Sequence, residues 1–417
     1  ALGGAVRAMK NQPRLRDGHQ IKLLKGSEAF FPALIQAIDA ARSHIHLETY
    51  IFDFHGDAAL VAAALERAGR RGLRVWVVVD GVGTPTLSEE WRVRFDKAGI
   101  EWRVYSPLGA LGLLIPNRWR RLHRKLCVID GHLAFCGGIN ILDDWYDPQY
   151  GQLQAPRLDF AVCATGALVQ QVQETATQLW WRMQAVRHVR QQNFPEAYSS
   201  FKAAGLHMPW LHDGPQAENA TWVARAGLLH RDNVLHRGQI EKAYRRAIAT
   251  ARHDVLIANA YFLPGRKLRQ ALILAAKRGV RVRLLLQGRY EYFMQYHAAR
   301  PVYRQLLEAG VEIYEYSQSF LHAKVAVMDA HYEHPWATVG SSNLDPFSLL
   351  LAREANVVVA DAYFAKQLQA ALEGAIENES ERILPPSLLA RSQVHRVLDW
   401  VAFGLMRLAI WLTGHRY

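Results

Sequence analysis

Two copies of the pattern His-x-Lys-x4-Asp bring together residue types that suit chemistry on a phosphodiester. The copies consist of His123, Lys125 and Asp130, and of His322, Lys324 and Asp329. Residues i and i+2 of a strand point to the same face, so each histidine projects into a site together with its lysine. An imidazole can attack phosphorus or carry a proton, and an ammonium group stabilises charge on the non-bridging oxygens. Related by a pseudo-twofold axis, the copies predict one site with two histidines and two lysines.

Each copy is followed by a Gly-small-x-Asn turn and then by an acidic residue that opens a further strand. The turn residues of interest are Asn140 in the first copy and Ser341 and Asn343 in the second, and the acids are Asp159 and Glu354. We expect the turns to contact phosphate, with one hydroxyl contact missing where Gly138 replaces serine. Each acid should accept a hydrogen bond from the far nitrogen of a histidine and fix its tautomer. The two motif aspartates are expected to hold the Gly turn rather than to touch phosphate.

A duplication of the whole chain supplies the elements that position these residues. Three segments of the first half recur in the same order in the second half, at offsets of about 210 residues: 37–42 at 247–252, 71–75 at 278–282, and 98–101 at 309–312. Each copy is predicted to run helix, strand, helix, strand, helix, strand. The runs 74–80 and 281–287 are apolar on mostly successive residues, which is typical of strands covered by helices on both faces. The sequence therefore predicts two tandem α/β sandwich domains with mixed sheets.

The expected boundaries follow the loss of periodicity and the change in composition. We predict a first domain over 1–190, a linker over 191–218, a second domain over 219–383 and an amphipathic, membrane-associating segment over 384–417. The second motif has ten residues between Asp329 and Gly340, against six at the same place in the first motif. We expect the extra residues to extend a hairpin and to leave the site intact.

Composition narrows the class of partner. Lysine and arginine number 50 against 38 acidic residues, a net charge of +12, which predicts an anionic partner such as a nucleic acid or a lipid surface. Residues 1–200 carry 24 basic and 19 acidic residues, and 201–417 carry 26 and 19, so the excess does not form a nucleic-acid-binding tail. A mean hydropathy of -0.10 excludes a polytopic membrane protein. The three cysteines favour a reducing compartment and lack metal-binding spacing. Residues 1–20 lack the apolar run of a signal peptide.

Two apolar segments are candidates for contact with a membrane. Residues 108–116 precede the basic run Arg118–Arg121 and the first histidine; they could dip into acyl chains, or form a buried loop beside a solvated basic run. Residues 400–412 are too short to span a bilayer, which takes about 20 apolar residues. We interpret them as an interfacial or re-entrant helix, with a packed core helix as the alternative.

Together, the paired motifs, their turn asparagines and the duplication resemble the phospholipase D superfamily. Within it the chain is similar to bacterial cardiolipin synthases of the B type, which lack N-terminal transmembrane helices. The resemblance covers about residues 18–383 and is closest at 121–125, 258–262 and 338–346.

The resemblance implies two phospholipase D-like domains that form a pseudo-twofold dimer with one active site at their interface. It implies transfer of a phosphatidyl group from phosphatidylglycerol to a second phosphatidylglycerol, or a related polar lipid, through a phosphohistidine, with release of glycerol. His123 would be the nucleophile and His322 the acid and base, without a metal or cofactor. The location implied is the cytoplasmic face of the bacterial inner membrane, as a peripheral or monotopic protein on anionic phospholipid.

Two other functions remain open at this point. A phospholipase D-type phosphodiesterase, either a lipid hydrolase or a nuclease, would use the same motifs, and a nuclease would use the positive charge to bind DNA. The apolar segments argue against a nuclease, so we expect no nucleic-acid partner. A basic scaffold without catalytic activity would leave the paired motifs unexplained.

Overall fold

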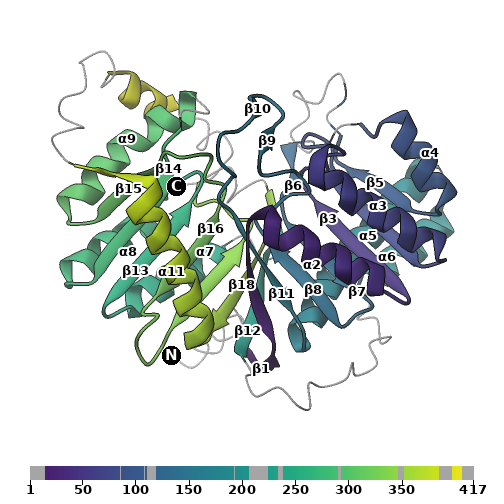
Figure 1. Cartoon of the computed structure of the whole chain (residues 1–417), viewed down its shortest axis with the longest axis horizontal. Helices are drawn as coiled ribbons and strands as arrows, with labels where there is room; N and C mark the ends of the chain where they lie inside the picture. The colour runs from purple at the N-terminus through teal and green to yellow at the C-terminus, as the bar shows by residue number, and fades with distance from the viewer. Residues whose placement is uncertain are drawn as a thin grey trace.

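Two α/β halves lie side by side and meet along one interface (Figure 1). The computed structural model describes residues 15–84, 86–107, 109, 119–191, 193–205, 224–232, 238–289, 293–345, 352–384 and 397–405. Most of the apolar segment 108–116 and residues 406–412 of the expected C-terminal helix lie outside these ranges. Within them, no helix is both long enough and apolar enough to cross a bilayer.

The first half is built on a seven-stranded mixed sheet. Its strands, in spatial order, are β2 (Ile21–Lys25), β11 (Phe160–Ala164), β8 (Leu133–Gly137), β7 (Lys125–Ile129), β3 (His44–Thr49), β4 (Arg74–Asp80) and β5 (Glu101–Tyr105). The pairs β3–β4 and β4–β5 are parallel and the others are antiparallel. The helices are α2 (Gly26–Ala40), α3 (Gly56–Arg70), α4 (Glu89–Lys97), α5 (Ala167–Arg190) and α6 (Phe194–Gly205).

The second half repeats this order and adds a strand at each edge. Its sheet runs β1 (Arg16–His19), β12 (Ala224–Arg231), β18 (Ala352–Ala360), β17 (Trp336–Gly340), β16 (Lys324–Met328), β13 (Asp254–Asn259), β14 (Arg281–Gln287), β15 (Glu312–Tyr316) and β19 (Ser380–Ile383). Its helices are α7 (Gln239–Thr250), α8 (Arg266–Lys277), α9 (Phe293–Glu308) and α11 (Ala362–Glu379). The predicted fold class, two tandem α/β sandwiches with mixed sheets, is confirmed.

Two short segments differ from the simple picture of two domains and a linker. Helix α6 lies inside the expected linker 191–218, directly after the long helix α5, and the two helices pack together. Strand β1 belongs by sequence to the first half but pairs with β12 in the sheet of the second. The chain therefore crosses between the halves at its start, while the domain boundaries remain predictions.

Side chains from both halves form a continuous hydrophobic core at the interface. Val128 and Val162 of the first half belong to the same buried cluster as Val325 and Val357 of the second. The short strand β6 (Arg121–Leu122) also crosses the interface and pairs in parallel with β18. Burial of this apolar surface favours a fixed arrangement of the halves, which a site shared between them needs.

Candidate active site

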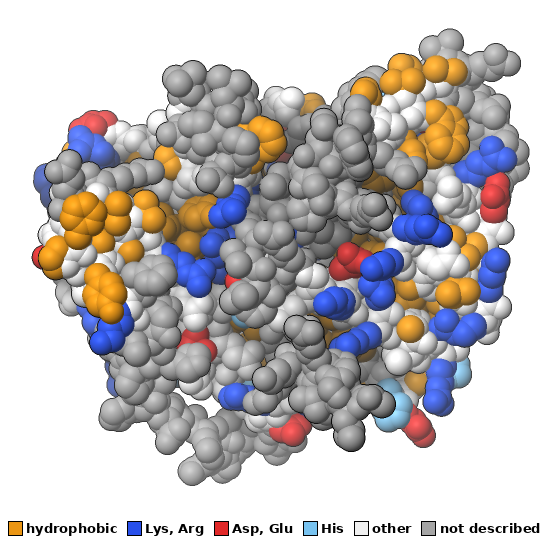
Figure 2. Space-filling view, turned by 180° about the vertical axis from the view of Figure 1, so that it is seen from behind, with side chains coloured by type: hydrophobic (Ala, Val, Ile, Leu, Met, Phe, Trp, Pro, Cys, Tyr) orange, Lys and Arg blue, Asp and Glu red, His pale blue; other side chains and the backbone are white. Residues whose placement is uncertain are grey.

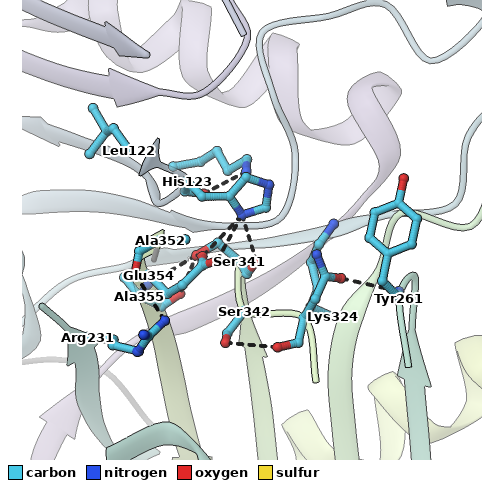
Figure 3. Close-up of polar contacts among 12 residues, drawn as sticks. Leu122, His123, Arg231, Tyr261, Lys324, Ser341, Ser342, Ala352, Glu354 and Ala355 are labelled. Carbon is cyan, nitrogen blue, oxygen red and sulfur yellow. Dashed lines mark hydrogen bonds and ion pairs between the residues drawn. The ribbon is translucent and has the colours of Figure 1, made fainter. Parts of the chain in front are cut away.

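The two motif histidines face each other across the interface. Their ring centroids lie 6.5 Å apart, and only 15% of the His123 side chain and 21% of the His322 side chain is exposed. In Figure 3, Lys324 and Tyr261 lie together to the right of His123. A phosphorus atom between the rings would lie within reach of both, since attack requires an approach of about 3–3.5 Å.

The backbone of each histidine is held by the opposite half. His123 follows strand β6, and its N–H donates to the carbonyl of Arg353 on β18 at 3.0 Å. His322 precedes strand β16, and its N–H donates to the carbonyl of Leu158 at 2.9 Å. The two contacts are equivalent under the pseudo-twofold relation. Hydrogen bonds across the interface therefore fix the backbone position of both histidines.

The carboxylates cross the interface in the same way. Nδ1 of His123 lies 3.1 Å from Glu354 Oε1 and 3.1 Å from the Ser341 carbonyl oxygen, and Nδ1 of His322 lies 2.6 Å from Asp159 Oδ2 (Figure 3 shows the His123 contacts). Each acid therefore orients the histidine of the other half. Because both neighbours of His123 Nδ1 accept, that nitrogen carries the proton and Nε2 keeps its lone pair.

Both motif lysines are buried beside their histidines. Nζ of Lys125 donates to the carbonyl of His123 at 2.6 Å, and Nζ of Lys324 donates to that of His322. Burial, followed by the neighbouring charge of Lys324, lowers the pKa of Lys125 to about 7. A nearby phosphate would oppose this shift, because an anion favours the charged ammonium.

The electrostatics of the site favour neutral imidazoles. Burial lowers the pKa of His123 despite the opposing charge of Glu354. Burial and then the charges of both lysines lower the pKa of His322 well below its usual value. Burial also raises the pKa of Asp159 to about 7. A carboxyl group whose pKa lies near neutral pH is thus hydrogen-bonded to Nδ1 of an imidazole that favours its neutral form.

The two Gly turns differ in how closely the neighbouring acid, Asp159 or Glu354, approaches the second turn residue. A Cβ atom at Gly138 would lie 2.2 Å from Oδ1 of Asp159, so the carboxylate occupies the place of a side chain. In the second half, the Ser341 hydroxyl donates to Glu354, whose longer side chain leaves room for it. In this arrangement the Ser341 hydroxyl holds the orienting carboxylate, and its expected contact with phosphate stays a prediction.

The two turn asparagines are buried, and the oxygen of each side-chain amide accepts a backbone hydrogen bond. Oδ1 of Asn140 accepts from the N–H of Ile51 at 3.1 Å, and Oδ1 of Asn343 accepts from the N–H of Tyr261 at 3.4 Å. With the amide oxygens used in this way, the NH2 groups are the parts left to donate. Their role towards phosphate stays a prediction.

The structure does not bring Asp130 and Asp329 to the histidines. Each follows the far end of its strand, about 16 Å from the lysine at the start at 3.3 Å per residue. Their carboxylates hold the turn between α2 and β3 in the first half and the turn between α7 and β13 in the second, rather than the Gly turn as expected. Asp329 accepts from the N–H groups of Arg252, His253 and Asp254 at 2.8–2.9 Å, and Asp130 binds the equivalent turn. These two residues are structural in this arrangement, and their place among the catalytic candidates is corrected.

Replacement of Asp329 by alanine is expected to lower the free energy of unfolding by about 2 kcal/mol or more, since three backbone donors lose a charged acceptor. Asp329 also has a φ of 51°, which strains alanine, so Asp329→Gly separates backbone strain from the lost hydrogen bonds. Urea unfolding measures both variants. Loss of turnover in protein that remains folded would contradict this structural role.

One aromatic residue near the site, Tyr50, lies outside the motifs and was not predicted from the sequence. The ring of Tyr50 lies 5.1 Å from that of His123 and 5.6 Å from Nζ of Lys125. The duplication places Ala260 at the corresponding position of the second half, so the two halves differ at this position. The position could have been found by comparing the two halves residue by residue.

In the part of the chain that the structure describes, no group of three or more His, Cys, Asp or Glu side chains is placed to hold a metal ion. The structure places two imidazoles, two ammonium groups and two carboxylates at the site.

Comparison with known proteins places the chain among enzymes of lipid synthesis. The family described as "Cardiolipin synthase, PLD-like domain" matches residues 34–150 and 244–376, one segment in each half. Cardiolipin synthase B of Escherichia coli (strain K12) is 34% identical, and that of Salmonella typhi 36% identical, with 96% of this chain and 92% of each relative covered. The crystal structure of phosphatidylserine synthase from Haemophilus influenzae Rd KW20 matches with a TM-score of 0.67 at 14% identity, covering 98% of this chain and 99% of that one. The last likeness concerns the fold alone.

Proposed function

The chain belongs to the cardiolipin synthases with phospholipase D-like domains, and we propose that it transfers the phosphatidyl group of one phosphatidylglycerol to a second. The observation that carries this proposal is the pair of facing histidines, each with Nδ1 held by a carboxylate of the other half. The products are cardiolipin and glycerol. A related polar lipid with a free hydroxyl could replace the second phosphatidylglycerol.

In the first step, Nε2 of His123 attacks phosphorus and the bond to the glycerol oxygen breaks. The leaving glycerol oxygen takes a proton from His322, and a phosphohistidine remains. In the second step, a hydroxyl of the acceptor lipid gives its proton to His322 and attacks phosphorus, and the P–N bond breaks. The two lysines stabilise charge on the non-bridging oxygens during both steps.

The environments of the two histidines support this division of roles. Two acceptors fix the proton of His123 on Nδ1 and leave Nε2 as a permanent nucleophile. His322 is paired with Asp159, whose pKa is raised to about 7 by burial, so this pair can take up and release a proton at neutral pH.

Incubation with phosphatidylglycerol labelled in its headgroup, presented in vesicles, tests the proposal directly. We expect cardiolipin and free glycerol in equal amounts. Phosphatidic acid with glycerol, and no cardiolipin, would show that water is the acceptor and would favour hydrolysis over transfer.

The pH dependence follows from the buried lysine. The pKa of Lys125 is lowered to about 7, so its ammonium group is present below this pH and is lost above it. Because the charged form binds phosphate, kcat/KM should fall as the pH rises through about 7. The pH at which it falls reflects the pKa of this group in the free enzyme. Measurements between pH 5.5 and 9 check this expectation. A rate that stays constant to pH 9 would contradict it.

We also propose that the protein acts as a peripheral or monotopic protein on the cytoplasmic face of the inner membrane, without a nucleic-acid partner. Basic side chains occur on both halves of the face in Figure 2 and lie among exposed hydrophobic ones. A basic surface of this kind is suited to an anionic phospholipid bilayer, whose lipids are both the support and the substrate.

A further inference from the structure

A short hairpin beside the active site exposes three aromatic side chains. Strands β9 (Tyr146–Asp147) and β10 (Gly151–Gln152) lie in sequence between the site residues Asn140 and Asp159. The hairpin rises between the two halves at the upper edge of the molecule (Figure 1). Trp145, Tyr146 and Tyr150 are between 37% and 48% exposed. Single exposed aromatics are ordinary, but three on one projecting turn next to a site are not.

The hairpin is braced at its base. Arg157, whose side chain is nearly buried, forms an ion pair with Asp147 at 2.9 Å and donates to the carbonyl of Asp143 at 3.3 Å. The ring of Tyr150 packs 5.4 Å from that of Phe320, two residues before His322. The turn is therefore held in place against the second half, and it presents Trp145 and Tyr146 outward without needing a partner for its structure.

A helix over residues 397–405 presents a second apolar face. Val397, Trp400, Val401 and Leu405 follow helical spacing and are between 51% and 62% exposed. The opposite face is fixed to the body of the second half, with Ala402 in its core.

A buried contact between Asp399 Oδ1 and His297 Nδ1, 2.5 Å apart, ties this helix to α9. A helix anchored on one face that exposes an apolar stripe on the other is the pattern of interfacial helices. In Figure 1 it lies at the same upper edge as the hairpin.

We propose that the β9–β10 hairpin and the outward face of helix 397–405 form a docking rim that seats the active site on an anionic phospholipid bilayer. Tryptophan and tyrosine prefer the headgroup level of a bilayer, where their rings are apolar and their N–H and O–H groups stay hydrated. A projecting turn also suits a fluid surface, since it requires no matching groove. The inference rests on the proposed function, because the substrate must reach the site from a bilayer.

The closing experiment compares three double variants in sedimentation with equimolar phosphatidylglycerol–phosphatidylcholine vesicles. Trp145→Ser with Tyr146→Ser removes the hairpin aromatics and spares Tyr150, which packs on Phe320. Trp400→Ser with Val401→Ser removes the helix face. Phe194→Ser with Tyr198→Ser removes two aromatics from α6 that are even more exposed, at 64% and 72%, and serves as the control. We expect vesicle binding about tenfold weaker or more for the first two and unchanged binding for the control.

Turnover of short-chain phosphatidylglycerol below its critical micelle concentration separates docking from catalysis. The wild type and all three variants should turn over this monomeric lipid equally. Absence of transfer by the wild type would contradict the proposed function but would leave the docking rim standing. Vesicle binding that is unchanged in the hairpin variant, or equally weakened in the α6 control, would overturn the docking rim. A change in oligomeric state, measured by light scattering, would assign the surface to a second copy of the chain and also overturn it.

Discussion

Alanine in place of either His123 or His322 is expected to reduce cardiolipin formation by about three orders of magnitude or more, because each imidazole makes or breaks a bond in both steps. The two variants should differ in what they accumulate. His123→Ala has no nucleophile and should form no covalent intermediate. His322→Ala lacks the base for the second step, so a slowly formed phosphohistidine should persist on His123.

Phosphatidylglycerol labelled in the phosphate, with an alkaline quench and mass spectrometry of peptides, measures this difference. His334→Ala is the matched control: this histidine lies close to the second motif but is exposed on the turn between β16 and β17, and its loss should leave turnover unchanged. Label found on His322 in the His123→Ala variant would reverse the proposed roles. Loss of label in both variants, with the control intact, would contradict the expected accumulation and show that formation of the phosphohistidine requires both imidazoles.

The duplication made most of the fold predictable. Equivalent strands such as β4 and β14 are apolar on successive residues, and this pattern survives in both copies because both faces of the sheet are covered. The edges were not predictable in the same way. Strand β1 has four residues and pairs with β12, more than 200 residues away, so nothing in its local sequence indicates which sheet it joins.

The site was predictable in its residue types but not in its connections. The spacing of His123 and Lys125 on a strand placed them together, and the acids were expected to orient the imidazoles. Which acid reaches which histidine depends on the interface between the halves, where the local sequence is nearly symmetric. Asp130 was misassigned for a similar reason, because its three backbone donors lie 86–88 residues earlier in the chain.

The crossed carboxylates lead to the second large effect. Glu354→Gln is expected to lower kcat by about two to four orders of magnitude, because an amide no longer fixes the Nδ1 proton of His123 or stabilises positive charge on its ring. Asp159→Asn should act through His322 in the same way. Since neither acid touches the substrate in the proposed mechanism, KM should change little. Altered pH profiles of kcat would distinguish this positioning role from a loss of folding, and a variant with normal kcat would contradict it.

The unequal Gly turns provide a sharper form of this prediction. Gly138→Ser places a Cβ atom against the Asp159 carboxylate, 2.2 Å from Oδ1, and should push it away from His322. The double variant Gly138→Ser with Asp159→Glu copies the pair of Ser341 and Glu354, in which the hydroxyl donates to the longer acid. We expect the single variant to lose about a hundredfold in kcat, and the double variant to recover part of it because the longer side chain can reach past the serine. Additive losses in the double variant would show that the spacing between turn and acid does not position the imidazole, since two independent defects would then be combined.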